Sequence, residues 1–246
     1  NYYKQSYDNF EIILVDNGSK DGTKEAIKEL FPNIKYLYLT ENYEMKAMNI
    51  AFSMAEGDIF WRGDDDSYPE STDCFKQIVD IFSKHPNVHI IASEDIEMRK
   101  IPIVYHWYGK EVDKINIPTD GYHSTRFHGT GVGFRRKVWE KTGGFWGWGY
   151  EELDWSIRAL NLGFNIRYFP NVRTLHFSAE ESRRTAWRWL RYYLKHVEFV
   201  WKYMPFFTAV NKTTYISINQ IAMGLYQRIP LKAILEGVFG VLPLAM

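Results

Sequence analysis

The chain has 246 residues, of which 46% are hydrophobic and 17% aromatic, enough to bury a sizeable core in one large domain or in a domain with a helical appendage. Its 30 basic and 30 acidic residues balance, so the composition gives no sign of a nucleic-acid-binding protein. The single cysteine, Cys74, excludes an internal disulfide, and no apolar run reaches the roughly 20 residues that a membrane-spanning helix needs.

Strands are predicted to alternate with helices over the first hundred residues. Residues 10–15 read FEIILV, an apolar run of strand length that ends at Asp16, and a helix is predicted over 21–31. The alternation continues with strands at 34–39, 59–62 and 88–93 and helices at 45–55 and 70–84. This order predicts an α/β domain with a mostly parallel sheet, whose ligands bind beyond the carboxyl ends of the strands.

The second half of the domain begins irregularly. Residues 95–128 are predicted to form loops with short strands. Regular structure is predicted to resume with GTGVGF at 129–134 and a short helix at 137–142. The next helix begins with three acids in its first turn, where the helix dipole favours carboxylates: Glu151, Glu152 and Asp154. A strand is predicted at 164–169, and His176 follows soon after it.

Acidic side chains follow two of the predicted strands. Asp16 ends the first, and GDDDSY at 63–68 follows the strand at 59–62, so we expect both to face one crevice. Three consecutive carboxylates repel each other unless a cation neutralises them, and oxygen-rich clusters suit Mg²⁺ or Mn²⁺. The alternatives are a solvated acidic loop that caps the next helix and, for His176, a purely structural histidine.

The stretch FWGWGYEELDW at 145–155 combines tryptophans, glycines and acids within eleven residues. Glycines contribute no side chain and lose conformational freedom on folding, so a core alone does not explain them. We interpret the stretch as part of a binding site.

Seven segments together resemble family 2 glycosyltransferases with the GT-A fold, in order and in approximate spacing, over about residues 5–180. They are VDNGSKDGT (15–23), KAMN (46–49), AEGD (55–58), GDDD (63–66), GTGVGFRRKVWEKTGGF (129–145), YEELDWSIR (150–158) and LHF (175–177). The segment WGWGYEELD also resembles WGWGGEDDD of β-1,4-galactosyltransferases. The resemblance implies a glycosyltransferase that uses a nucleotide-sugar donor.

The resemblance implies a donor site at the carboxyl ends of the strands. Asp16 would accept a hydrogen bond from the base of the donor nucleotide. Lys46 and Asn49 would lie near its phosphates or ribose. Asp64 and the neighbouring Asp65 would also belong to the donor site.

The metal site and the acceptor site are likewise implied by the resemblance. Asp64 and Asp66 would be the two acids of a DxD motif that holds Mn²⁺ or Mg²⁺, and His176 would complete the metal site. Trp146 and Trp148 would form a wall against which an acceptor sugar stacks.

Inverting members of the family use a carboxylate as general base for the acceptor hydroxyl. Glu152 occupies that position here, where the family usually has aspartate. The extra methylene moves the carboxylate by on the order of 1 Å, a displacement that can matter for rate. Glu151 and Asp154 therefore remain alternative bases, or else orient the acceptor.

The beginning of the chain departs from the family pattern. Family members start with a strand that ends in a Pro-x-Tyr-Asn-like segment and with a helix, and this sequence lacks both. We therefore interpret the chain as a fragment. A non-catalytic carbohydrate-binding or membrane-associated relative of the same fold is the alternative to an active enzyme. Another Mg²⁺-dependent α/β enzyme, such as a nucleotidyltransferase, leaves WGWGYEELD unexplained.

Residues 182–246 are predicted to form a basic, aromatic-rich helical extension of a catalytic domain at 1–181. Nine basic residues and two acids follow residue 181. The aromatic side chains could pack on the catalytic domain, lie in an anionic membrane interface, or, with least support, bind single-stranded nucleic acid. The extension resembles that of family members that act on lipid-linked saccharides. It implies a cytoplasmic location, with peripheral attachment to the inner face of the cell membrane as one option.

Overall fold

The computed structural model describes residues 1–98, 103–105, 111–178, 186–226, 229–232 and 234–235. The chain divides into two compact units, Asn1–Ser178 and Ala179–Met246. The first contains every residue that we assigned to the donor, metal, acceptor and catalytic sites.

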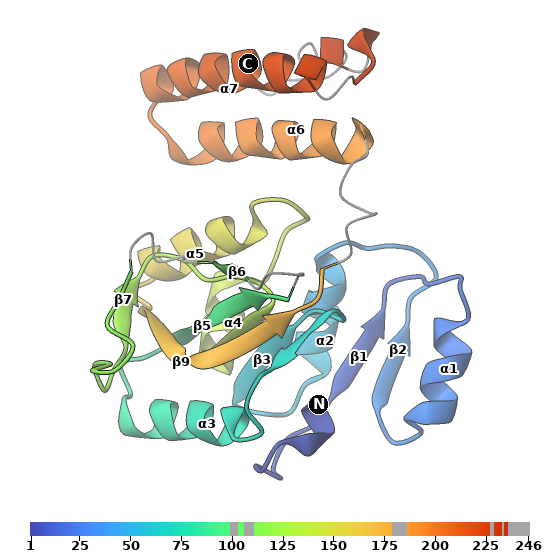
Figure 1. Cartoon of the computed structure of the whole chain (residues 1–246), viewed down its shortest axis with the longest axis vertical. Helices are drawn as coiled ribbons and strands as arrows, with labels where there is room; N and C mark the ends of the chain where they lie inside the picture. The colour runs from blue at the N-terminus through green and yellow to red at the C-terminus, as the bar shows by residue number, and fades with distance from the viewer. Residues whose placement is uncertain (99–102, 106–110, 179–185, 227–228, 233, 236–246) are drawn as a thin grey trace. The chain divides into compact units, whose positions relative to one another are not determined.

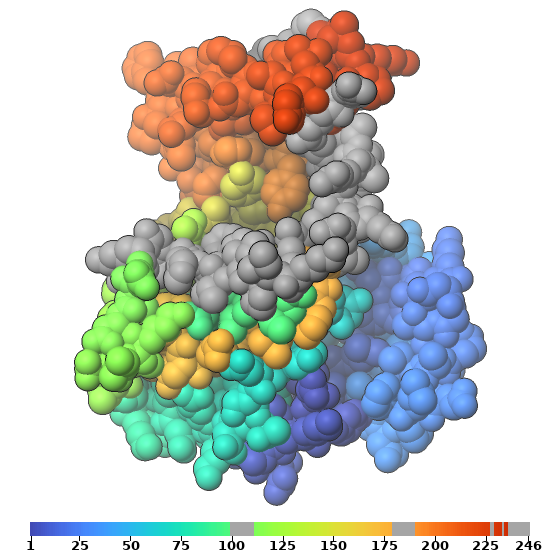
Figure 2. Space-filling view, in the orientation of Figure 1, coloured from blue at the N-terminus to red at the C-terminus, as the bar shows by residue number. Residues whose placement is uncertain are grey.

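The first unit begins with a small parallel sheet. A 3-10 helix, η1 (Tyr2–Lys4), precedes β1 (Ile13–Asp16), which pairs with β2 (Lys35–Tyr38), and α1 (Thr23–Leu30) connects the two strands. β1, β2 and α1 lie at one side of the unit, and β7 lies at the opposite side (Figure 1, Figure 2). As the apolar run FEIILV predicted, Asp16 stands at the carboxyl end of β1.

Seven strands form the main sheet, in the order β3-β8-β5-β9-β4, with β6 paired to β5 and β7 to β9. Their bounds are β3 (Ile59–Gly63), β4 (Ser67–Pro69), β5 (Ile90–Glu97), β6 (Ile103–Tyr105), β7 (Tyr122–Ser124), β8 (Gly131–Arg135) and β9 (Ile166–His176). The sequence had indicated neither the short β4 nor the full length of β9.

The α/β class is as expected, but the main sheet is mixed and not mostly parallel. β8 runs antiparallel to both of its neighbours, β3 and β5, whereas β9 runs parallel to β5. A parallel neighbour needs a long crossover, usually a helix, and the described part of the segment between β5 and β8 contains none. Strands β3, β5 and β9 still point in one direction, so their carboxyl ends share an edge.

Helices cover both faces of the main sheet (Figure 1). On one face α3 (Cys74–Lys84) packs through Cys74, Ile78 and Phe82 against β5 and β9. On the other face lie α2 (Lys46–Met54), α4 (Arg136–Thr142) and α5 (Glu151–Asn161). Their shared core includes Phe52, Phe60, Phe134, Val138, Phe145 and Trp155.

β9 is longer than the predicted strand at 164–169 because it continues through an irregularity. Phe169 pairs with Ser93 and Arg173 with Glu94, so three residues of β9 have no partner on β5. Pro170 lies in this bulge, and proline in a sequence ordinarily marks a strand end. The continued strand delivers His176 opposite Glu97 and Ser67, at the same edge of the sheet.

The described part of the second unit contains a pair of long helices, α6 (Ala186–Tyr203) and α7 (Phe206–Tyr226). They pack through an apolar seam of Tyr193, Val197, Val200, Ala209 and Ile216. A hydrogen bond of 2.9 Å from Trp201 Nε1 to Thr213 Oγ1 adds a polar contact to the seam. Among the described residues, no helix is both long enough and apolar enough to cross a membrane.

Candidate active site

The loop that follows β3 holds the predicted acids at the carboxyl edge of the sheet. Ser67 fixes this loop: its hydroxyl accepts a hydrogen bond of 3.0 Å from Asp64 N and donates one of 2.7 Å to Thr130 O. The side chains of Asp64 and Asp66 are each 38% exposed, so a ligand can reach both. Asp65 is exposed.

His176, the last residue of β9, faces Asp66. Its Nε2 lies 3.5 Å from Asp66 Oδ1, while Nδ1 lies 3.4 Å from Glu97 Oε2 and 3.8 Å from Asp95 Oδ2. A carboxylate behind a histidine fixes the ring and leaves its other nitrogen for a metal ion. The structure therefore brings together two of the three predicted metal ligands in a suitable orientation.

Asp66 and His176 fit a divalent cation of the Mn²⁺ or Mg²⁺ type, because such ions bind through one or two carboxylates together with water and substrate phosphates. Asp64 does not join them: its Oδ1 lies 3.6 Å from Arg62 Nη2. Within the described ranges, no three acidic, histidine or cysteine side chains form a ready metal site by themselves.

A second histidine, His128, was not predicted for the site. Its Nδ1 lies 2.6 Å from Oδ2 of Asp95, whose side chain is fully buried, and 2.9 Å from Thr130 Oγ1. The His128 and His176 rings are 6.1 Å apart. Asp95 therefore lies between two imidazoles behind the acidic loop, and its place on the interior strand β5 gave no sign of this in the sequence.

Arg62 was also missed. Its side chain is only 3% exposed, and Nη1 lies 3.5 Å from Glu152 Oε1 on α5. The guanidinium carbon lies 5.1 Å from the centre of the Phe145 ring. The sequence did contain a signal that Arg62 is buried. Arg62 follows the core residue Phe60 by two positions in the strand, and residues at that spacing point to the same face.

The first turn of α5 presents Glu151 and Glu152 to the acidic edge. Tyr150 caps the helix in the left-handed conformation, with φ 63°, and Gly149 N donates to Glu151 Oε2. Burial, followed by the charge of Glu152, raises the pKa of Glu151 to about 7. Glu151 is therefore substantially protonated near neutral pH.

The carboxyl of Asp64 is also shifted toward its neutral form. Burial raises its pKa, and the nearby charge of Arg62 opposes that shift without reversing it. The charges of Glu152 and Asp66 raise the pKa further. A cation at this edge would relieve the repulsion among the three carboxylates.

Asp154 points to a different task. Its Oδ2 lies 2.8 Å from Arg158 Nη2, and Arg158 also donates to the backbone oxygens of Thr142 and, at 2.6 Å, Gly144. The Arg158 guanidinium carbon lies 4.5 Å from the centre of the Trp146 ring. Asp154 thus pairs with an arginine that supports the loop before α5. This pairing does not favour Asp154 as the general base.

The two tryptophans of the predicted acceptor wall differ in exposure. Trp146 is 56% exposed, whereas Trp148 is half-buried and its backbone N donates to Glu44 Oε2 at 3.4 Å. Glu44 adopts φ 54°, an uncommon conformation for a residue with a side chain. Trp146 offers the accessible ring, and Trp148 is tied through its backbone to the loop before α2.

Asn49 and Lys46 both lie on α2. Asn49 Nδ2 donates to Phe145 O at 2.6 Å and its Oδ1 accepts from Phe145 N at 2.8 Å, so both ends of the amide hold the loop that carries Trp146. The contact with the donor that the family resemblance implies for Asn49 has no support in this geometry. Lys46 is exposed at the start of the helix.

Asp16 lies at the end of β1, 5% exposed. It accepts hydrogen bonds of 2.6 Å from the Tyr36 hydroxyl and 2.8 Å from Ser19 N. Burial alone would raise the pKa of Asp16, but these bonds outweigh it and the pKa is lowered. An ionised carboxylate held in this way retains lone pairs for a further donor.

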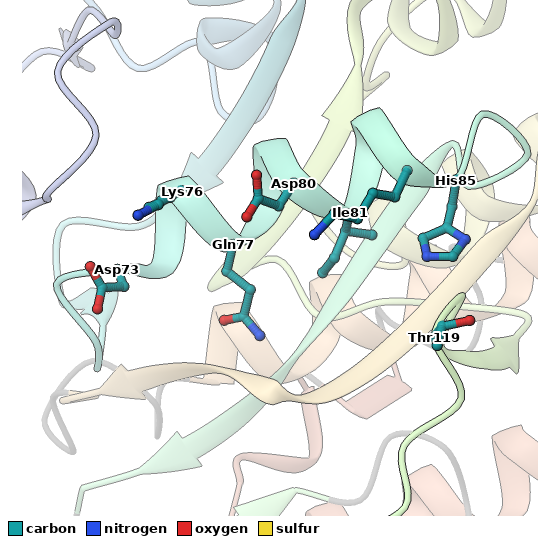
Figure 3. A pocket seen from close by; sticks show the side chains of 8 residues that line it. Asp73, Lys76, Gln77, Asp80, Ile81, His85 and Thr119 are labelled. Carbon is teal, nitrogen blue, oxygen red and sulfur yellow. The ribbon is translucent and has the colours of Figure 1, made fainter.

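A groove of about 710 Å³ lies along α3, away from these residues (Figure 3). Acids and bases alternate along it, and none of the predicted site residues lines it: Asp73, Lys76, Gln77, Asp80, Ile81, Lys84, His85 and Thr119. The candidate active site is therefore defined by the acidic edge of the sheet.

An α/β unit with paired acids after one strand of the main sheet and acids at the start of a facing helix has the fold of GT-A glycosyltransferases. The sequence profile described as Glycosyl transferase family 2 matches residues 2–143. The match spans more than half of the chain, and the chain belongs to this family.

Two curated relatives are each 22% identical to this chain. They are the "Probable glycosyltransferase YdaM" of Bacillus subtilis, over 209 residues, and a dolichyl N-acetyl-α-D-glucosaminyl phosphate 3-β-D-2,3-diacetamido-2,3-dideoxy-β-D-glucuronosyltransferase of Methanococcus voltae, over 210 residues. The matches cover 77% and 75% of this chain, but only 49% and 63% of the relatives. The chain thus spans about half to two thirds of their length.

Two solved structures share the fold. A mannosyltransferase from Pyrobaculum calidifontis, in complex with GDP-Man and Mn²⁺, aligns with a TM-score of 0.59 at 18% identity, covering 98% of this chain and 69% of its own. GalNAc-T7 with UDP, GalNAc and Mn²⁺ aligns with a TM-score of 0.58 at 16% identity, covering 75% of this chain and 41% of its own. Both contain a nucleotide or nucleotide sugar together with Mn²⁺.

Proposed function

We propose that this chain transfers a sugar, with inversion, from a nucleoside diphosphate sugar to a hydroxyl of a saccharide or lipid-linked saccharide, in the synthesis of a cell-surface glycan. The observation that carries the proposal is the acidic edge. Asp66 faces His176 there, and the buried Arg62 lies between Asp64 and Glu152. This edge offers a place for a metal-bound diphosphate beside a carboxylate that can accept a proton.

The donor would lie across the carboxyl ends of β1 and β3. Asp16 would accept a hydrogen bond from its base, Asp64 and Asp65 would face the ribose, and the exposed Lys46 would face the phosphates. Asp66 and His176, with Asp64 close by, would hold Mn²⁺ or Mg²⁺. Such a cation neutralises the charge that develops on a leaving diphosphate.

The acceptor would stack on Trp146, whose exposed ring can cover the apolar face of a sugar. Glu152 would take the proton of the acceptor hydroxyl while the oxygen of that hydroxyl bonds to the anomeric carbon of the donor sugar. The bond from that carbon to the diphosphate oxygen breaks, and its electron pair leaves with the nucleoside diphosphate. Attack from the face opposite the leaving group inverts the anomeric centre in one step.

The three acids of α5 would then have different tasks. Glu152 would be the base, because it occupies the position of the family's base and its carboxylate lies beside the Arg62 guanidinium at the acidic edge. Glu151, with a pKa of about 7, would often carry a proton and donate a hydrogen bond to the acceptor. Asp154, paired with Arg158, would support the loop that carries Trp146.

A lipid-linked acceptor is suggested by one relative and by one feature of this chain. The name of the Methanococcus voltae relative describes transfer to a sugar linked to dolichyl phosphate. Helix α7 of this chain exposes large apolar side chains, among them Phe207 and Ile218. A protein whose acceptor is anchored in a membrane needs a surface that can lie against lipid.

The proposal is tested by a donor screen followed by a transfer assay. Nucleotide sugars are screened with Mn²⁺ by thermal shift, because a ligand that binds the folded state raises the melting temperature. Transfer from any donor found is then measured for Asp66→Ala and Glu152→Gln. Exposed Asp80→Asn on α3 is the control.

We expect transfer to be lost in the first two variants and kept in the control. Unchanged transfer in Asp66→Ala would refute the proposal. Saccharide binding without transfer or donor hydrolysis by the parent chain would instead favour a non-catalytic relative.

A further inference from the structure

Arg62 is a charged residue inside an apolar layer. It follows Phe60 by two positions on β3 and so shares its core-facing side, where Phe134, Phe145 and Trp155 are buried. A charge in such surroundings is strongly unfavourable unless it is paired. The residues that pair with Arg62 therefore indicate its role.

The two acidic partners of Arg62 come from different parts of the chain. Glu152 Oε1 lies 3.5 Å from Nη1, and Asp64 Oδ1 lies 3.6 Å from Nη2. Asp64 belongs to the loop that also carries Asp66, whereas Glu152 is 90 residues from Arg62 in sequence. A guanidinium can contact two carboxylates at once through its fixed fork, which a lysine ammonium cannot reproduce.

Gly129 leaves the space that this arrangement needs. A Cβ atom there would overlap the Glu152 carboxylate and lie 2.5 Å from Arg62 Nη2. Nothing in its backbone conformation demands glycine, because Gly129 is not among the residues with positive φ. The absence of a side chain at Gly129 therefore serves the Arg62–Glu152 pair.

We infer that Arg62 is a positioning residue for sugar transfer: it fixes the Glu152 carboxylate relative to the Asp64–Asp66 loop, and Gly129 keeps that position open. The inference rests on the proposed function. It assigns Arg62 no contact with donor or acceptor, because the side chain is almost fully buried. Its effect should therefore fall on the rate of the chemical step and not on binding.

A double-mutant cycle tests whether Arg62 acts through Glu152. Arg62→Met should lower kcat by about a hundredfold, the effect of a displacement of roughly 1 Å at the base, with the donor KM unchanged. Glu152→Asp keeps a base but withdraws it from Arg62. In that background Arg62→Met should have little further effect, because coupled residues are not additive.

Two further comparisons keep the test decisive if Arg62→Met folds poorly. Arg62→Lys keeps the charge but not the fork, so it should fold and still lose most of the rate. Gly129→Ala should lower kcat by displacing the pair without removing any functional group. Gly133→Ala on β8 is its control, because a Cβ there comes no closer than 3.4 Å to its nearest neighbour, Ile78 Cγ2, and makes ordinary contacts with Trp61 and Ile91.

Mn²⁺ alone, titrated by electron paramagnetic resonance, supplies a readout besides activity. We expect Mn²⁺ affinity to be retained in Arg62→Lys and Gly129→Ala. A loss of Mn²⁺ affinity as large as the loss of kcat, or effects that add in the cycle, would overturn the inference while the parent chain remains active. An inactive parent chain would instead overturn the proposed function, and the inference with it.

Discussion

Glu151 and Glu152 are adjacent in sequence but face different surroundings. Glu152 lies beside the Arg62 guanidinium, whereas Glu151 is buried next to the charge of Glu152 and accepts a hydrogen bond from Gly149 N. A carboxyl with a raised pKa, as Glu151 has, can hold and donate a proton at a pH where carboxyls are ordinarily ionised. This difference favours Glu152 over Glu151 as the base in the transfer that we propose, a choice that the sequence left open.

The raised pKa of Glu151 predicts how stability depends on pH. Between the ordinary value of 4.5 and about 7, the folded chain holds a proton that the unfolded chain has lost, so the free energy of unfolding falls as pH rises through this window. Glu151→Gln should remove that loss and stabilise the protein above pH 7, by about 1.4 kcal/mol for each unit of pKa difference.

Urea denaturation at several pH values measures this effect. Glu140→Gln, which changes an exposed glutamate on α4, is the control and should leave the slope between pH 5 and pH 8 intact. Parallel stability curves for the parent chain and Glu151→Gln would show that Glu151 titrates normally.

At the scale of elements, the sequence predicted what depends on local pattern. The apolar runs before Asp16 and Asp64 and the acidic first turn of α5 placed three segments correctly, because strand ends and helix starts have local signals. The direction of β8 and the bulge in β9 depend on which strands pair. Periodicity along one segment contains no such information.

The same distinction holds for the candidate site. The family resemblance placed Asp66 and His176 together, and in the structure Asp66 follows β3 and His176 ends β9 at one edge of the sheet. The hydrogen bonds between Asn49 and the Phe145 backbone join residues 96 positions apart, so neither segment alone predicts them. The motif resemblance placed Asn49 at the donor, and only the side-chain contacts indicate another task.

Asn49→Ala tests that task. It removes two hydrogen bonds to the Phe145 backbone and should destabilise the protein by about 1–3 kcal/mol, because the backbone groups lose their partners. The loop that carries Trp146 would loosen, so the KM for the acceptor should rise more than that for the donor. Chemical denaturation and initial-rate kinetics measure the two effects.

Ser53→Ala, which changes an exposed serine on the same helix, is the control and should alter neither KM. A rise in the donor KM alone would return Asn49 to the donor site, as the family resemblance implies.

At the scale of the whole molecule, charge is divided unevenly along a neutral chain. Nine basic residues and two acids follow residue 181, so the remainder of the chain carries the excess of acids. Helix α7 buries Ala209 and Ile216 against α6, yet Phe207 is 85%, Ile218 62% and Leu225 55% exposed. These three lie at helical spacing on the side opposite the seam, which gives α7 two apolar stripes.

A basic segment with an exposed apolar stripe is typical of attachment to an anionic membrane surface. We expect liposomes that contain anionic lipid to retain the full chain at low salt and to retain less of it at high salt, because salt screens the attraction.

Changing Phe207, Ile218 and Leu225 together to serine should weaken retention, whereas the control changes Asn211→Ser and Asn219→Ser on the same helix should not. Co-sedimentation measures the bound fraction. Equal retention of the triple variant and the control would leave only the charge as the attachment, and no retention of the parent chain at low salt would contradict membrane attachment altogether.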